Sequence, residues 1–205
     1  MKIVIVDCKM GNLVSVKKAF SKLGFQSTIS NNKVDIENAG LLVLPGVGHF
    51  SNTMENLKKL NILQVLNEQV LEKKKPILGI CLGMQLLSEY SEEGDSEGLG
   101  WIKGKTKKFQ LDTSRFKIPH IGWNTLEICQ KDSFLKNTSI NDQFYFVHSY
   151  HVECDDYNDV AAFSEYGEKF TASIQKDNIF GTQFHPEKSH EQGLTILKSF
   201  IDTNV

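Results

Sequence analysis

The stretch PILGICLGMQLL, residues 76–87, decides the fold of this chain. Residues 76–80 form an apolar run typical of a buried strand, and residues 82–90 predict a helix. Cys81 lies at the turn between them, with Gly79 and Gly83 on either side. A side chain at such a sharp turn holds a strained backbone, which closes only when small residues flank it. The segment therefore predicts an elbow that presents the Cys81 sulfur as a nucleophile.

The N-terminal half repeats this alternation of strand and helix. Lys2–Val6 and Leu41–Leu44 are continuous apolar runs typical of buried parallel strands. Asn12–Leu23 carries apolar residues at helical spacing and ends before Gly24, and a second helix is expected over about Ser51–Lys74. Such units predict a parallel sheet with helices packed against it.

The second half has a different texture. Shorter, partly alternating segments with turn residues fill about Gly98–Val160, including Phe144–Val152, and predict antiparallel strands. Ile179–Phe184 follows as one more strand and Gly193–Asp202 as a closing helix. We therefore expect an α/β fold of three layers, with a mostly parallel central sheet and a smaller antiparallel sheet.

The composition limits the classes of partner. With 205 residues, 40% of them hydrophobic, the chain can bury a full core, and a single domain over residues 1–205 is expected. The formal net charge of −2 leaves no basic excess for nucleic acid or an anionic membrane. No apolar run approaches the ~20 residues of a membrane span. The four cysteines include no CxxC pair, so we expect a cytoplasmic protein.

A second motif, QFHPE at residues 183–187, lies at the end of the last predicted strand. In a parallel sheet this strand ends at the same carboxyl edge as the elbow, so His185 can reach Cys81. Glu187, held by the rigid Pro186, can accept a hydrogen bond from the second imidazole nitrogen and orient the ring as a base. Taken alone, the cysteine would fit a small buried residue and His-Pro-Glu an ordinary polar turn. Together they predict a Cys-His-Glu triad.

These two motifs, with the glycine-rich LPGVG at residues 44–48, resemble the class I (triad) glutamine amidotransferases, and the resemblance spans nearly the whole chain. Within that family it is closest to the glutaminase subunits of imidazole glycerol phosphate synthase. The segments that carry it are MGNLVSV, LPGVGHF, CLGMQLL, SEEG, GLGWIKG, KIPHIGWN, YFVHSYH and FTASIQKDNIFGTQFHPEKS. The resemblance implies a flavodoxin-like class I glutamine amidotransferase fold and hydrolysis of L-glutamine to glutamate and ammonia without a cofactor.

The resemblance also implies a role for each site residue. Cys81 would attack the glutamine amide to form a γ-glutamyl thioester, His185 would move protons, and Glu187 would orient His185. The oxyanion hole corresponds to the backbone amides of Val47 and Leu82. The positions that hold the α-amino and α-carboxylate groups of glutamine correspond to Gly48, Gln85, Glu93, Ser149 and Tyr150. From the residues alone, Gln85 and Glu93 would also fit a solvated helix face and an exposed acidic loop.

The resemblance implies a partner as well. The family's glutaminase subunits pass ammonia to a (β/α)₈-barrel cyclase in histidine biosynthesis, which implies a 1:1 heterodimer here. Asn12, Trp123 and Lys188 match positions that face that partner, although Trp123 would also fit a core aromatic. One departure is Cys8-Lys9 after the first strand, where the family usually has an aromatic or small residue. The alternative is therefore a paralogous ammonia supplier to a sugar-amidating enzyme of surface polysaccharide synthesis.

Other interpretations fit the residues less well. His148, His151 and Cys154 are three residues apart, but strand side chains alternate between faces, so no metal site is expected. Gly46 and Gly48 lack the third glycine and the ribose-binding acid of a dinucleotide site. A cysteine peptidase or another Cys-His hydrolase would lack the combined set of motifs, and a degenerate regulatory module would not keep the triad.

Overall fold

The computed structural model describes residues 2–204. The strands of its large sheet are β1 (Ile3–Val6), β2 (Ser27–Ser30), β3 (Leu41–Gly46), β4 (Ile77–Cys81), β9 (Glu127–Ile128), β12 (Val160–Tyr166), β13 (Glu168–Lys176) and β14 (Ile179–Thr182). The other strands are β5 (Tyr90–Ser91), β6 (Ser96–Glu97), β7 (Gly104–Lys108), β8 (His120–Asn124), β10 (Phe144–His148) and β11 (Tyr150–Cys154). The helices are α1 (Leu13–Lys22), α2 (Lys33–Glu37), α3 (Phe50–Lys59), α4 (Leu63–Asn67), α5 (Leu82–Gln85) and α6 (His190–Thr203), with short helical turns η1 (Glu68–Glu72), η2 (Tyr157–Asp159) and η3 (Pro186–Lys188).

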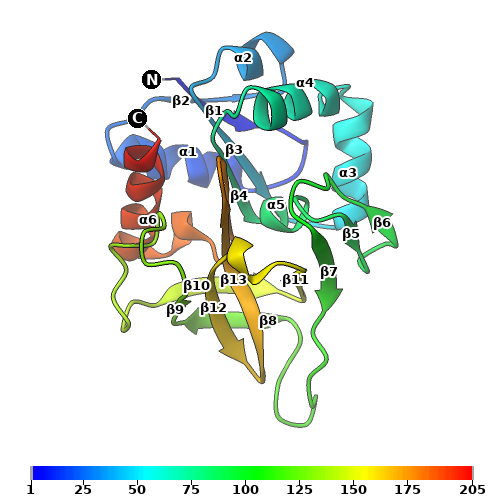
Figure 1. Ribbon diagram of the computed structural model, residues 1–205, viewed down its shortest axis with the longest axis vertical. Helices are drawn as coiled ribbons and strands as arrows, with labels where there is room; N and C mark the ends of the chain where they lie inside the picture. The colour runs from blue at the N-terminus through cyan, green and yellow to red at the C-terminus, as the bar shows by residue number, and fades with distance from the viewer. Residues whose placement is uncertain (1, 205) are drawn as a thin grey trace.

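The large sheet has eight strands in the order β2-β1-β3-β4-β14-β13-β12-β9 and runs through the centre of the molecule (Figure 1). The pairs from β2 to β14 are parallel. The pairs from β14 to β9 are antiparallel. The predicted mostly parallel central sheet is confirmed, and its parallel strands bring their carboxyl ends to one edge.

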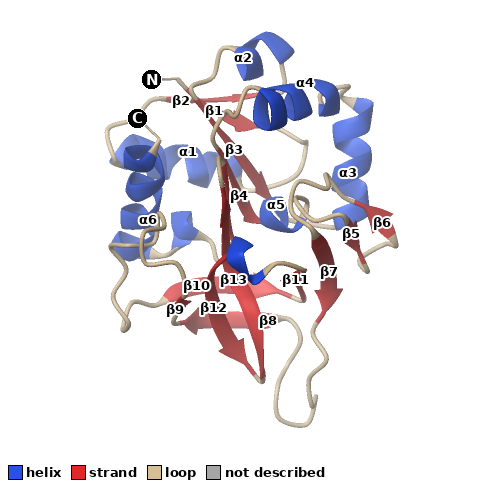
Figure 2. Ribbon diagram, viewed as in Figure 1, coloured by secondary structure: helices blue, strands red, loops and turns tan. Residues whose placement is uncertain are grey.

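Helices cover both faces of this sheet, as Figure 2 shows. Successive residues of a strand point to opposite faces, so β1 contributes to two cores. Ile3 and Ile5 belong to one core, together with apolar side chains of α1 and α6. Val4 and Val6 belong to the other, together with apolar side chains of α2, α3 and α4. The predicted three-layer α/β arrangement is therefore confirmed.

The smaller antiparallel part of the fold is present as two sheets rather than one. β8 and β10 form an antiparallel pair. β11, β7, β5 and β6 form the second sheet, in which β7 pairs antiparallel with β11 but parallel with β5. The strand expected over Phe144–Val152 divides between these sheets at Ser149, where the chain bends.

Two helices differ from the prediction. The helix expected over Ser51–Lys74 is interrupted after α3, because Asn61 has a left-handed φ of 54° that asparagine tolerates better than most residues. The helix expected over Leu82–Tyr90 is only the single turn α5, since the Ser88 hydroxyl donates to the Gln85 carbonyl at 2.8 Å and competes with helical hydrogen bonding. Within residues 2–204, no helix has both the length and the apolar character that crossing a membrane requires.

Close packing between β3 and α5 holds the elbow. A Cβ atom added at Gly83 would lie 1.7 Å from the Leu44 carbonyl oxygen, so only glycine fits there. Cys81 itself has a φ of 54°, a left-handed conformation that costs a residue with a side chain roughly 1–3 kcal/mol. The glycine contact allows β3, β4 and α5 to pack closely enough to keep this strained turn in place.

We expect Gly83→Ala to destabilise the protein by at least about 3 kcal/mol, because the added methyl group forces α5 away from the Leu44 carbonyl. Denaturant unfolding measures the loss. Gly24→Ala is the matched control: Gly24 has a φ of +83° but no atom within 4 Å of the added Cβ. It should lose only about 1 kcal/mol, from backbone strain. Equal losses in the two variants would contradict the packing argument.

Candidate active site

Cys81 occupies the predicted elbow, at the end of β4, with φ and ψ of 54° and −110°. Only 6% of the residue is exposed, and it lines a cavity together with His185. Because α5 is one turn long, its dipole supports a thiolate less than the longer helix predicted from the sequence would. Other groups must therefore stabilise an anionic sulfur.

Two polar groups lie against the Cys81 sulfur. The Gln183 Nε2 atom lies 3.6 Å from it as a donor, and the Val147 carbonyl oxygen lies 3.9 Å away as an acceptor. Leu82, the next residue along the chain, is the first of α5, so its amide has no partner within the helix. The amide donor suits a thiolate, whereas the carbonyl suits a protonated thiol.

The parallel pairing of β4 with β14 brings His185 to this sulfur. Thr182 of β14 lies opposite Ile80 of β4, so the chain leaves β14 at the level of the elbow. The His185 amide then donates to the Tyr145 carbonyl at 2.9 Å, which ties this segment to β10. The elbow and the QFHPE motif thus meet at one edge of the sheet, where two parallel strands end.

Glu187 orients the His185 ring. The His185 Nδ1 and Glu187 Oε1 atoms are 2.9 Å apart, and the two side chains are 2% and 1% exposed. A carboxylate can only accept, so Nδ1 donates and Nε2 is the basic atom of a neutral ring. The Asn12 amide also donates to Glu187 Oε1, at 3.4 Å. His185 Nε2 is buried without a hydrogen bond of normal geometry to any of residues 2–204, but the nearby Cys81 sulfur still acts on the ring.

The charge of Cys81 controls the protonation of His185. Burial alone would lower the pKa of the imidazole, because it disfavours the charged ring. The negative sulfur and the hydrogen-bonded Glu187 outweigh burial and raise the pKa of His185 from 6.5 to about 10. The ring is therefore protonated at neutral pH and can give a proton to a leaving group beside the sulfur.

A cavity of about 350 Å³ opens at this pair. Small-molecule sites typically measure ~300–1,000 Å³. Most of the site residues predicted from the sequence line it: Val47, Gly48, Cys81, Leu82, Gln85, Glu93, Ser149 and His185. Pro119, Val147 and His148, which were not among the predicted catalytic or glutamine-binding residues, complete the wall. Segments far apart along the chain therefore converge on one space beside the sulfur.

Two oxygen acceptors of this cavity remain available to a ligand. Gln85 is 4% exposed rather than on a solvated face, and its Nε2 group donates to the Tyr150 carbonyl at 2.8 Å and to Gln183 Oε1 at 3.0 Å. Both amide protons are used, which leaves the Gln85 carbonyl oxygen. Glu93 Oε2 accepts from the Phe50 amide at 2.8 Å, which leaves Glu93 Oε1. Two such acceptors suit a ligand ammonium group.

Tyr150 is the predicted glutamine-binding residue that is not part of the cavity wall. Its carbonyl accepts hydrogen bonds from Gln85 Nε2 and from His148 Nδ1, both at 2.8 Å. The Tyr150 backbone carbonyl therefore holds the Gln85 side-chain amide in place.

Gln183 is a residue of the site that sequence reasoning missed. Its side chain is fully buried and contacts both Cys81 and Gln85. The available signal was its position two residues before His185, because residues i and i+2 of an extended segment share a face. A buried glutamine on the face of the predicted base should itself lie near the nucleophile.

Trp123 and Lys188, which were predicted to face a partner, lie around one exposed aromatic surface. The Trp123 side chain is 43% exposed and stacks on His190 with ring centroids 5.0 Å apart. Lys188 Nζ lies 5.6 Å from the ring centroid of Tyr145, the residue that pairs with Trp123 across β8 and β10. Trp123 is therefore a surface residue rather than a core aromatic.

Three buried histidines lie beside the cavity. His120 Nδ1 and His148 Nε2 are 3.2 Å apart, and the Phe109 ring packs against His148 and His151 with centroids 5.1 and 4.9 Å away. Burial lowers the pKa of His120 to about 4 and that of His148 well below 6.5, so both rings are neutral. Among residues 2–204, no three His, Cys, Asp or Glu side chains are grouped as metal ligands would be.

Known proteins are similar to this chain over nearly its whole length. The family model described as "Glutamine amidotransferase class-I" matches residues 4–203. A relative from Campylobacter jejuni, named "Imidazole glycerol phosphate synthase subunit HisH 1", is 52% identical over 199 residues, which cover 97% of this chain and 98% of the relative. "Imidazole glycerol phosphate synthase subunit HisH 2" from Methanococcus maripaludis is 48% identical over 199 residues, with the same coverage.

Solved structures share the fold at much lower sequence identity. A crystal structure of a glutamine amidotransferase aligns with a TM-score of 0.75 and 16% identity, covering 98% of both chains. The structure of PurLQS from Thermotoga maritima aligns with a TM-score of 0.76 and 19% identity, again covering 98% of both. The fold predicted from the resemblance is therefore confirmed.

We expect Cys81→Ala to lower the pKa of His185 from about 10 toward its ordinary value of 6.5. The sign follows from the charge: a thiolate favours the protonated ring, so its removal favours the neutral ring. Titration of the imidazole resonances by NMR measures the change. Cys129→Ala, which removes an exposed thiol, should leave the pKa of His185 unchanged. A high pKa that persists in Cys81→Ala would show that Glu187 alone raises it.

Proposed function

The chain belongs to the class I glutamine amidotransferase family, and we propose that it is the glutaminase subunit of an imidazole glycerol phosphate synthase in histidine biosynthesis. The observation that carries this proposal is that Cys81 and His185 line one cavity while Glu187 contacts the His185 Nδ1 atom. The relatives that share 48–52% of their residues with this chain bear that name. The proposed reaction is hydrolysis of L-glutamine to glutamate and ammonia.

The triad geometry supports a two-stage reaction. The Cys81 thiolate attacks the side-chain amide carbon of glutamine, and His185 Nε2 gives its proton to the amide nitrogen, which leaves as ammonia. A γ-glutamyl thioester remains. The neutral ring then takes a proton from water, whose oxygen attacks the thioester and releases glutamate, so that thiolate and imidazolium are restored. Glu187 keeps Nε2 directed at the reacting atoms throughout.

Each carbonyl attack places a negative charge on the substrate oxygen. We assign its stabilisation to the backbone amides of Val47 and Leu82, because both residues line the cavity with Cys81 and Gly46 of β3 pairs with Cys81 of β4. Donors in such an oxyanion hole typically contribute ~3–4 kcal/mol each. Gly48, with a φ of +116°, lets the loop after β3 turn at this point.

The polar wall of the cavity supports recognition of the glutamine backbone. Gln85 Oε1 and Glu93 Oε1 are the acceptors for the α-ammonium group, and Gly48 and Ser149 border the same space for the α-carboxylate. Tyr150 contributes by holding the Gln85 amide. This division leaves the side-chain amide of the substrate to reach Cys81.

Ammonia must pass to a partner subunit, as the names of the relatives imply a multi-subunit synthase. We propose that the partner is a (β/α)₈-barrel cyclase in a 1:1 heterodimer, in the cytoplasm. Asn12, Trp123 and Lys188 are the proposed contacts. The exposed ring of Trp123 and the charge of Lys188 stand on the surface formed by β8, β10 and η3, next to the triad.

A sugar-amidating enzyme of surface polysaccharide synthesis is the second candidate partner. The observation that favours it is the loop after β1, where Lys9 has a φ of 60° and its Nζ lies 3.2 Å from the Asp7 carboxylate. This lysine departs from the residues usual in the histidine-pathway subunits. A changed loop on the partner side would fit a paralogous ammonia supplier.

We expect Cys81→Ala to abolish glutamine-dependent formation of imidazole glycerol phosphate while the complex still works with added ammonium, because only thioester formation is lost. Product formation is measured with each nitrogen source in turn. Cys129→Ala should keep both reactions. Loss of the ammonium-dependent reaction in Cys81→Ala would refute the division of labour between the subunits. Ammonia transfer to a sugar-amidating enzyme alone would select the second candidate.

We expect Trp123→Ala to weaken the complex with the cyclase at least tenfold in Kd, because a tryptophan at the centre of an interface often contributes ~2 kcal/mol or more. Titration calorimetry measures the affinity. Tyr157→Ala is the control, since Tyr157 is also a large exposed aromatic, 76% exposed, but lies on η2. A similar loss in both variants would contradict the proposed interface.

A further inference from the structure

We propose that Gln183 is a further catalytic residue: its side-chain amide donates a hydrogen bond to the Cys81 sulfur and is oriented for this by Gln85 and the Tyr150 carbonyl. The inference rests on the proposed function, because it assigns a role within the same nucleophile. It adds a donor from the residue that follows β14, and this donor is separate from the Cys-His-Glu triad.

The first hydrogen bond orients Gln85. A backbone carbonyl can only accept, so the Gln85 atom that lies 2.8 Å from the Tyr150 carbonyl oxygen must be the amide nitrogen. The same carbonyl accepts from His148 Nδ1 at 2.8 Å, so it is held from a second direction. The Gln85 amide therefore has one possible orientation.

The second hydrogen bond orients Gln183. The Gln85 nitrogen has a second proton, and the Gln183 atom 3.0 Å away must accept it. That atom is therefore Oε1, and the Gln183 nitrogen is left on the side of Cys81. The orientation of Gln183 thus follows from a backbone carbonyl two steps away.

The third contact reaches the nucleophile. Gln183 Nε2 lies 3.6 Å from the Cys81 sulfur, within hydrogen-bond range for sulfur. Gln183 is fully buried and Gln85 is 4% exposed, so water competes little with either amide. In such surroundings a donor to a charged acceptor is stronger than it would be in water.

This donor has a chemical consequence for the sulfur. The Val147 carbonyl, 3.9 Å from the sulfur, can accept from the thiol, whereas the Gln183 amide can donate to the thiolate. Gln183 therefore favours the charged, nucleophilic form, in addition to the His185 imidazolium. The short α5 helix stabilises a thiolate less than a long helix would. The hydrogen bond from Gln183 adds to that stabilisation.

The test is the pH dependence of alkylation of Cys81 by iodoacetamide in the isolated chain, followed by peptide mass spectrometry. Gln183→Met removes the donor at similar volume. We expect the midpoint of the rate profile to rise by about one pH unit, with about a tenfold lower rate at pH values well below the midpoint. Gln69→Met is the matched control, because Gln69 is also buried, 1% exposed, but lies on η1. It should keep the wild-type profile.

A second variant tests the orienting hydrogen bonds. Gln85→Met removes the group that orients Gln183, and Gln85 has no hydrogen bond to the sulfur of its own among residues 2–204. We expect its alkylation midpoint to rise as well. The double variant with Gln183→Met should show no further rise, because both changes remove the same interaction. Additive effects would overturn the claim that Gln85 acts through Gln183.

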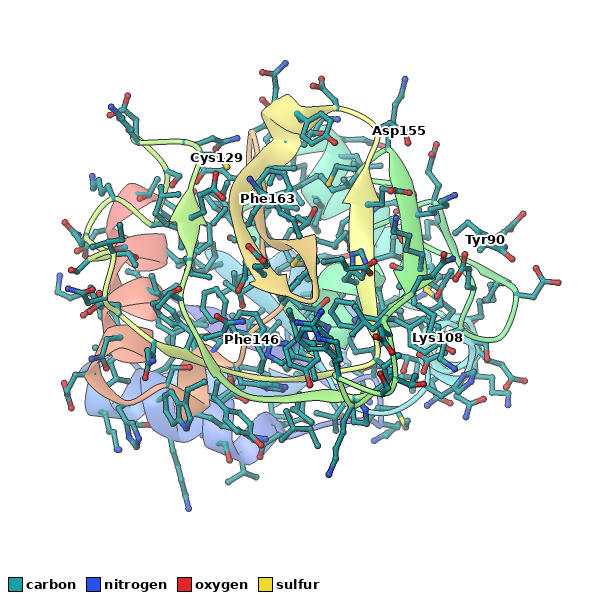
Figure 3. All side chains as sticks on the ribbon, turned by 90° about the horizontal axis from the view of Figure 1, so that it is seen from below. Tyr90, Lys108, Cys129, Phe146, Asp155 and Phe163 are labelled. Atoms are coloured by element: carbon teal, nitrogen blue, oxygen red, sulfur yellow. The ribbon has the colours of Figure 1, made fainter. Side chains whose placement is uncertain are left out.

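Two further results separate the failure of this inference from failure of the proposed function. Cys129 is an exposed thiol that serves as an internal reference. It lies far from Tyr150, because Tyr150 pairs with Lys108, and Figure 3 shows Cys129 and Lys108 on opposite sides of the view. Wild-type Cys81 reacting no faster than Cys129 at neutral pH would overturn both proposals. A reactive Cys81 whose profile is unchanged in Gln183→Met would overturn the inference alone. If that variant does not fold, Gln183→Leu, which also removes the donor and adds no charge, should raise the midpoint, and a wild-type midpoint would overturn the inference.

Discussion

The parallel pairing of β4 with β3 on one side and with β14 on the other is the constraint on which the rest of the site depends. Gly46 of β3 lies opposite Cys81, and Thr182 of β14 lies opposite Ile80. Three loops from distant parts of the chain therefore open at the same level. A slip of one residue in either pairing would turn the following side chains to the other face of the sheet. The glycine contact between β3 and α5 then closes the turn at the sulfur.

Burial strengthens the interactions of the reactive groups at this edge of the sheet, and it also lowers the stability of the fold. His185, Glu187 and Gln183 are almost fully removed from water, so each charge and each donor acts more strongly than it would at the surface. The strained backbone of Cys81 and the removal of these charged groups from water both oppose folding. The two hydrophobic cores on either face of the sheet offset these terms.

Strand β10 connects the proposed partner surface with the reacting groups. Tyr145 contacts Lys188 and Trp123 at the surface, and its carbonyl accepts from the His185 amide at 2.9 Å. Two residues further along the same strand, the Val147 carbonyl lies 3.9 Å from the Cys81 sulfur. A protein bound at Trp123 would therefore lie against β10, the strand that contacts both His185 and Cys81. The proposed partner surface and the reacting groups thus both contact the same short strand, β10.

The sequence by itself determined the order of strands and helices around the elbow and the choice of Cys81, His185 and Glu187, because these depend on short apolar runs and on motifs of a few adjacent residues. It placed the helix ends less well, since Asn61 and Ser88 act through single hydrogen bonds or dihedral angles. Only the tertiary structure decided what holds the site together. The partners of the Gln85 amide lie 65 and 98 positions away, and no local pattern encodes a hydrogen bond between segments that meet only in the folded sheet.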